Sequence, residues 1–224
     1  SSLRALGNDA TFGVIPSNGA KIPLGDGAEI ITRTANGSSG DINYGVIELL
    51  GNATITGGQS TSGHHTSRNF NSEIRGPGQL TLNGVNNNTI ELNALNTFDG
   101  LVALSTHNQR FRVDVNATGS LGIGDVTIDD NATLIINAVD AMNDFGTLNL
   151  IGSKDSGFAS KLILNADDTI GAFFLDGVDQ GTGMFDSSSL LTDIDGMPLI
   201  TGNGILTVTG ITEPPPEVPE PASV

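Results

Sequence analysis

The chain has 224 residues, of which 37% are hydrophobic and only 4% aromatic, and its formal net charge is -16 because 25 acidic residues face 9 lysines and arginines. Nucleic acids and anionic membrane surfaces require a basic face, so this charge argues against both as partners. The chain has no cysteine, which excludes disulfides and thiolate metal sites, and it has no run of 18 apolar residues that could span a bilayer.

Short stretches in which apolar and polar residues alternate recur along the chain, separated by Gly, Asn or Asp. Period-2 alternation with β-branched residues predicts strands, and the Gly, Asn and Asp residues predict turns between them. The predicted strands, in chain order, are 28–34, 45–50, 79–83, 89–93, 100–104, 111–115, 125–129, 132–137, 147–151, 161–165, 172–175 and 205–209. The fold class is therefore all-β.

Several of these strands resemble one another, as in GQLTLNG (78–84), GTLNLIG (146–152) and GILTVTG (204–210). Such look-alike segments favour a β-solenoid, in which each turn stacks on the next at about 4.8 Å. An antiparallel β-sandwich is the alternative, because the short spacing between strands also suits that fold. The solenoid predicts stacked parallel turns over residues 78–210, with the following side chains pointing inward: Leu80, Leu82, Leu134, Ile136, Leu148, Leu150, Leu162, Leu164, Leu206 and Val208.

The chain divides into three predicted regions. Residues 1–77 form a less regular β region that contains a long polar loop, 57–73, which we expect to be mobile. Residues 78–210 form the solenoid. Residues 211–224 form a Pro/Glu-rich tail, for which the sequence predicts an extended polyproline II stalk.

The tail ends with Val218-Pro219-Glu220-Pro221. These four residues resemble the PEP-CTERM sorting signals of Gram-negative bacteria, in which a Val-Pro-Glu-Pro motif precedes a hydrophobic helix and a basic cluster. Neither of those segments is present in these 224 residues. The resemblance implies that an exosortase is a partner during export and that the protein reaches the cell surface.

Two segments of the body are similar to the passenger repeats of autotransporters. They are Asn-Thr-Phe-Asp-Gly at 96–100 and Leu-Gly-Ile-Gly-Asp-Val-Thr-Ile at 121–128, and the resemblance covers roughly residues 78–221. It implies a right-handed parallel β-helix with an extracellular structural or adhesive role, and it implies no defined ligand.

The sequence offers few candidates for catalysis or metal binding. Asp129-Asp130 and Asp167-Asp168 are the best carboxylate pairs, but neighbouring strand residues point to opposite faces and aspartate is common in turns. His64-His65 lacks a third ligand at metal-binding spacing. Asp/Asn-rich turns leave calcium possible but unassigned. We therefore expect no enzyme activity, no catalytic residue and no cofactor.

Two functions from different classes remain. The first is an extracellular structural protein of a bacterial surface or matrix that self-associates end to end into filaments, because the terminal turns of a solenoid expose unpaired strand edges. The alternative is a β-helix that binds or cleaves an exopolysaccharide. We favour the structural function, since the sequence shows no cluster of carboxylates, basic residues and aromatic residues of the kind found in sugar-binding grooves.

Overall fold

The computed structural model describes residues 2–5, 21–34, 40–42, 45–60, 67–84, 88–105, 110–129, 131–151 and 159–211. All regular elements in these ranges are β-strands, and none of the ranges contains a helix able to cross a membrane. The strands are β1 (Ser2–Ala5), β2 (Lys21–Leu24), β3 (Ala28–Thr34), β4 (Gly40–Ile42), β5 (Val46–Leu49), β6 (Ala53–Ser60), β7 (Ser67–Phe70), β8 (Glu73–Gly76), β9 (Leu80–Gly84), β10 (Thr89–Leu92), β11 (Thr97–Phe98), β12 (Gly100–Ser105), β13 (Phe111–Val115), β14 (Asp125–Ile128), β15 (Ala132–Ile136), β16 (Thr147–Leu150), β17 (Lys161–Leu164), β18 (Asp168–Ile170), β19 (Ala172–Leu175), β20 (Val178–Asp179), β21 (Gly183–Phe185), β22 (Ile200–Gly202) and β23 (Leu206–Val208).

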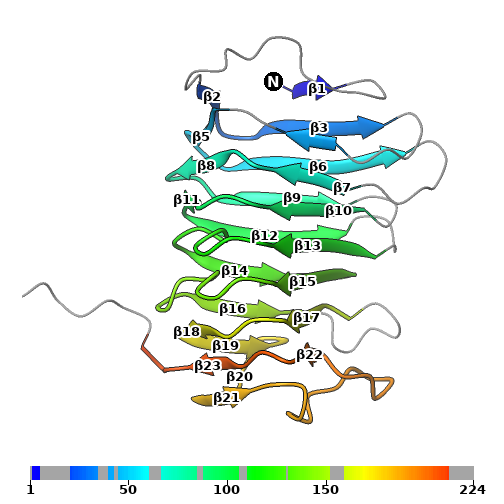
Figure 1. The fold of residues 1–224 in the computed structure, drawn as a ribbon, viewed down its shortest axis with the longest axis vertical. Coiled ribbons are helices and arrows are strands. Elements are labelled where there is room, and N and C mark those ends of the chain that lie inside the picture. The colour runs from blue at the N-terminus through cyan, green and yellow to red at the C-terminus, as the bar shows by residue number, and fades with distance from the viewer. Residues whose placement is uncertain are drawn as a thin grey trace, which may run out of the picture.

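The strands stack as successive turns of one solenoid (Figure 1). Sheet A has the order β1-β3-β6-β9-β12-β14-β16-β19-β20, and sheet C has the order β22-β17-β15-β13-β10-β7-β4. Sheet B (β11-β8-β5-β2) and sheet D (β18-β23-β21) are shorter. Neighbours are parallel from β1 to β19 in sheet A and throughout sheets B and C, which confirms the parallel β-solenoid and excludes the antiparallel sandwich.

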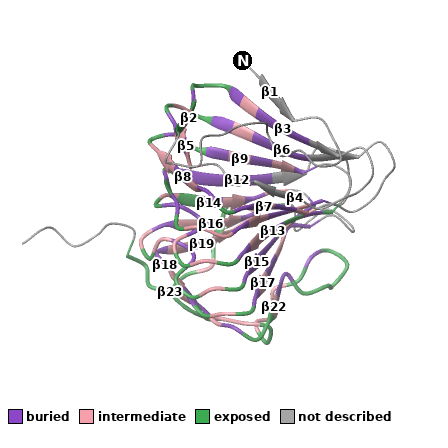
Figure 2. Cartoon of the chain, turned by 45° about the horizontal axis from the view of Figure 1, so that its top comes forward, coloured by how far each residue is buried: buried purple, intermediate pink, exposed green. Residues whose placement is uncertain are grey.

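The interior consists of columns of apolar side chains, one residue from each turn. In sheet A, for example, Ile55 pairs with Leu82 and Leu82 with Ala103, and all three are fully buried. Buried and partly exposed residues alternate along the strands (Figure 2). All ten side chains predicted to point inward are buried, so the period-2 pattern placed the core correctly.

Glycine is required where one turn passes close to the backbone of the turn before it. Gly76 has a φ of 122°, and a Cβ atom there would lie 2.0 Å from the carbonyl oxygen of Leu49. No other residue type adopts this backbone region without strain, and none has a side chain small enough for the space. The close approach of these turns therefore depends on glycine.

The polar segment 57–73, predicted as a loop, contains strand residues on both sides of 61–66, which lie outside the described residues. β6 extends to Ser60, and β7 covers Ser67–Phe70 and pairs in parallel with β10. Phe70 is buried in the core, and Arg68 is buried at the other inward position of β7. The prediction was wrong there because one phenylalanine among polar residues gives too weak an alternation. His64 and His65 lie outside the described residues.

The C-terminal end of the solenoid contains two antiparallel strands, β20 and β21, that the sequence analysis did not predict. β20 pairs antiparallel with β19, and β21 pairs antiparallel with β23, so parallel stacking stops at these two strands. Asp176 (φ 49°) and Gly177 (φ 76°) form the tight turn between β19 and β20. Asp-Gly between two strands is a strong hairpin signal, because both residues tolerate positive φ. The tail from residue 212 onward, including the sorting motif, lies outside the described residues.

Candidate functional site

The Asp167-Asp168 pair is the best placed of the predicted carboxylate pairs, and its two side chains serve different turns. The Oδ1 atom of Asp167 accepts a hydrogen bond of 2.9 Å from the N–H of Ile205, in the following turn. The Oδ2 atom of Asp168 accepts bonds of 3.2 Å from the N–H groups of Ala141 and Met142, in the preceding turn. The two carboxylates thus link three turns and do not face one another as a catalytic pair.

Asp168 is almost completely buried, with 2% of its surface exposed. Its Oδ1 atom accepts a further bond of 2.9 Å from the N–H of Thr169. Burial raises the pKa of Asp168 to about 7, the three backbone N–H groups lower it, and the nearby Asp140 raises it further. Both carboxyl oxygens of Asp168 are thus hydrogen-bonded to the backbone. With a pKa of about 7, the carboxyl group keeps its proton up to neutral pH.

Asn96 has the same role in an earlier turn. Its Oδ1 atom accepts a bond of 2.7 Å from the N–H of Ile74, and its Nδ2 atom donates one of 2.7 Å to the carbonyl oxygen of Ser120. Asn96 is also 2% exposed. A short buried polar side chain at this corner thus connects consecutive turns, whether it is an amide or a carboxylic acid.

A shallow hollow of about 190 Å³ lies outside Asp168 at this corner. It is lined by Val139, Asp140, Asp167, Asp168, Thr169, Met184, Ile205 and Thr207. Among the described residues no basic or aromatic side chain lines it, and these are the groups on which sugar-binding sites normally depend. Nowhere in the described ranges do three or more His, Cys, Asp or Glu side chains gather as metal ligands would, and calcium stays unassigned.

Five asparagines form a ladder of amides along one edge of sheet C. Asn93 donates to Asn71 at 2.9 Å, Asn116 to Asn93, Asn137 to Asn116 and Asn165 to Asn137, the last three at 2.8 Å. Each asparagine directly follows the last residue of its sheet C strand. The sequence analysis placed asparagines in turns but missed the ladder. The available signal is the repeated dipeptide of an inward apolar residue followed by Asn.

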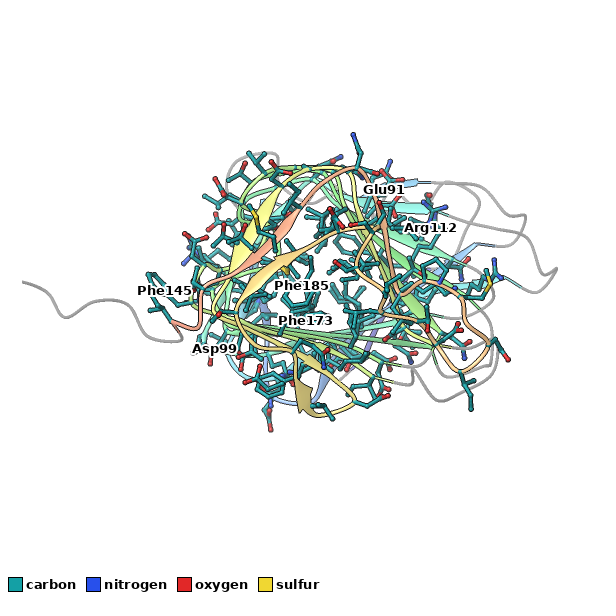
Figure 3. The ribbon with its side chains drawn as sticks, turned by 90° about the horizontal axis from the view of Figure 1, so that it is seen from below. Glu91, Asp99, Arg112, Phe145, Phe173 and Phe185 are labelled. Atoms are coloured by element: carbon teal, nitrogen blue, oxygen red, sulfur yellow. The ribbon has the colours of Figure 1, made fainter. Side chains whose placement is uncertain are left out.

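A second carboxylate pair is formed by residues that lie far apart in the sequence. Glu91 and Asp114 are direct partners on the parallel strands β10 and β13, and Arg112 lies 3.5 Å from the Oδ2 atom of Asp114. Burial raises the pKa of Asp114, Arg112 lowers it, and Glu91 raises it. The Oδ1 atom of Asp114 is buried and has no hydrogen-bond partner among the described residues. Figure 3 shows Glu91 and Arg112 on the same side of the solenoid.

This pair was missed because only the solenoid register brings the two acids together. Aligning TIELN (89–93) with RVDVN (112–116) reveals it, since both the acids and the ladder asparagines then coincide. Of the other predicted candidates, Asp130 lies outside the described residues, and the N–H of Asp129 donates to the carbonyl oxygen of Ala103 at 2.8 Å. No catalytic role follows from that position.

Searches with this chain match no protein-family model, no curated protein and no solved structure. The functional proposals therefore depend on the geometry of its own residues and on the motifs of its sequence.

Proposed function

We propose that this chain is an extracellular structural protein of a bacterial cell surface or matrix, which self-associates end to end. The observation that carries the proposal is the role of the polar side chains: Asn96, Asp167, Asp168 and the asparagine ladder all join one turn to the next. Polar side chains that bond the backbone and each other are unavailable for substrate. They suit a protein whose task is to remain rigid.

Hydrogen bonds between the side chains and backbone of successive turns suit a protein that works outside the cell. A typical hydrogen bond contributes about 1 kcal/mol, and one that satisfies a buried backbone N–H avoids the larger cost of leaving that group unpaired. The chain obtains its cross-links from such bonds, without the disulfides on which many secreted domains depend, since it contains no cysteine. An apolar core with stacked amides is independent of redox conditions.

The proposed export signal is Val218, Pro219, Glu220 and Pro221, recognised by an exosortase. Replacing Pro219, Glu220 and Pro221 with alanine in the full-length precursor should leave the solenoid folded and abolish surface display, because the tail lies beyond the last core strand, β23. Replacing Pro214, Pro215 and Pro216 is the matched control, since it changes the same tail outside the motif. Antibody labelling of intact cells measures display. Normal display of the motif variant would contradict the proposal.

The second candidate is an exopolysaccharide-binding or polysaccharide-cleaving protein, and the pairing of Glu91 with Asp114 is the observation that favours it. Two carboxylates on neighbouring strands are the minimum for acid–base cleavage of a glycosidic bond. Glu91→Gln with Asp114→Asn should then abolish cleavage of the exopolysaccharide from the producing cells. Glu73→Gln is the control, because Glu73 is also a partly exposed strand carboxylate beside an arginine. If the unaltered protein neither retains nor shortens the polymer, this candidate is excluded.

A further inference from the structure

The C-terminal end of the solenoid carries an unusual concentration of exposed apolar side chains. We define the C-terminal face as residues 176–199, which include β20 and β21 at the lower end of Figure 1. Leu190 is 95% exposed and Met184 is 71% exposed. Val178, Ile194 and Met197 are also exposed. Exposed apolar side chains gathered over one end of a molecule mark an interaction surface, whereas single ones scattered over a surface need no explanation.

The same face is entirely acidic in its charge. Residues 176–199 contain five aspartates and no lysine, arginine or histidine. The opposite end of the sequence is balanced: residues 1–34 contain three acidic residues and three lysines and arginines. Two C-terminal faces therefore repel one another, while a C-terminal face and an N-terminal end do not. This difference in repulsion favours the N-terminal end over a second C-terminal face as the partner surface.

The N-terminal end offers a suitable counterpart. β2 is the edge strand of sheet B, and in the described part of the chain it pairs only with β5. An edge strand presents unpaired backbone groups to a neighbour. Lys21, in β2, has a half-exposed side chain, and its ammonium group lies 3.1 Å from Glu48 of the adjacent strand.

From these observations we infer that the C-terminal face of one copy docks against the N-terminal turn of a second copy, by which we mean the turn that contains β2 (Lys21–Leu24). This inference rests on the proposed structural function and names the surface through which the chain assembles. The contact joins two different surfaces, so each added copy leaves a free end of each kind. Assembly then continues into a filament along the solenoid axis and does not stop at a closed dimer.

Sedimentation velocity over a range of protein and salt concentrations tests the inference. The average mass of the unaltered protein should rise beyond a dimer with concentration, and more readily at high salt, because screening weakens the repulsion between copies of net charge -16. Met184→Gln with Leu190→Gln should require at least tenfold more protein to reach the same mass. Ile123→Gln is the matched control, since Ile123 is 57% exposed in a middle turn. Circular dichroism confirms that both variants are folded.

A charge variant tests the other side of the contact. Lys21→Glu should weaken association at low salt and have less effect at high salt, because it adds repulsion that salt screens. Equal association of Lys21→Glu and the unaltered protein would show that the N-terminal turn is not the partner.

The remaining outcomes each decide a different point. A mass that stops at a dimer would indicate a contact between like faces and overturn the head-to-tail arrangement. Unchanged association of the Met184/Leu190 variant would overturn the assignment of the C-terminal face, and a protein that stays monomeric under every condition would overturn assembly itself. Surface display of the same variant, measured in parallel, tests export separately: display without assembly leaves the export proposal intact.

Discussion

At the scale of single residues, the ladder asparagines join turns through their side chains while the backbone carries the strand pairing. Asn116 occupies the middle of the ladder, where it donates to Asn93 and accepts from Asn137. Asn165 stands at the C-terminal end of the ladder, and in the described part of the chain its side chain makes one amide bond, to Asn137. The two positions therefore differ in the number of amide bonds that an alanine would remove.

We expect Asn116→Ala to lower the free energy of unfolding by about 1–2 kcal/mol, and Asn165→Ala by roughly half as much, because the bonds are partly exposed to solvent. Urea denaturation of both variants measures the difference. Thr118→Ala is the control, since Thr118 is exposed in the turn that follows Asn116. Equal losses at Asn116 and Asn165 would contradict the dependence on the number of bonds, and losses no larger than that of Thr118→Ala would show that the ladder contributes nothing to stability.

Asp168 makes stability depend on pH in a direction opposite to that of most carboxylates. Its pKa is raised to about 7 in the folded chain, against about 3.9 for an unfolded aspartate. Between these values the folded state binds a proton that the unfolded state does not. Stability therefore falls as the pH rises through this window and becomes constant above pH 7.

Asp168→Asn should remove this pH dependence. The amide nitrogen cannot accept the backbone N–H bonds that one carboxylate oxygen now accepts, so the variant loses stability by the same amount at every pH. From pH 5 to pH 8 the unaltered protein should lose on the order of 2 kcal/mol more stability than the variant. Denaturant titrations at both pH values measure this difference. Asp179→Asn is the control, because Asp179 is exposed at the C-terminal end. Parallel pH profiles for the unaltered protein and Asp168→Asn would contradict the assignment.

At the scale of elements, the sequence predicted the strands and the inward residues wherever apolar and polar positions alternate. Leu80, Leu82, Leu148 and Leu150 were placed correctly for this reason. The same reasoning missed β7, where arginine takes an inward position, and the hairpin at Asp176-Gly177. Side-chain contacts between turns depend on register, which local patterns do not specify. The amide ladder and the placing of Glu91 beside Asp114 are the two examples.

The turns between elements provide a comparison of two glycines. Gly76 has a positive φ and would place a Cβ 2.0 Å from a carbonyl oxygen, whereas Gly177 has a positive φ with nothing within 4 Å. Gly177→Ala should therefore cost about 1 kcal/mol through backbone strain alone. Gly76→Ala should cost roughly 3 kcal/mol or more, since the turns must also separate. Thermal unfolding of the two variants tests this, and similar losses would mean that the stacking does not require close approach at Gly76.

At the scale of the whole molecule, the two ends of the solenoid are unlike in both structure and charge. At the C-terminal end, the antiparallel strands β20 and β21 end the parallel stack on a face with exposed apolar side chains, whose charged residues are all aspartates. At the other end, β2 and β4 are the edge strands of sheets B and C. A solenoid with two different ends, one of them apolar, is suited to head-to-tail assembly, in which all copies point in the same direction. The difference between the two ends and the apolar surface at one of them become apparent only when the stacked turns are seen together.

Electron microscopy of material from the surface of producing cells tests the central claim most directly. Since the solenoid axis would become the filament axis, we expect filaments one solenoid wide, with a strand repeat of about 4.8 Å along that axis in diffraction. The Met184→Gln, Leu190→Gln variant should leave the surface without filaments although the protein is still exported. Surface material that contains only separate particles, or producing cells that retain the protein inside, would contradict the account.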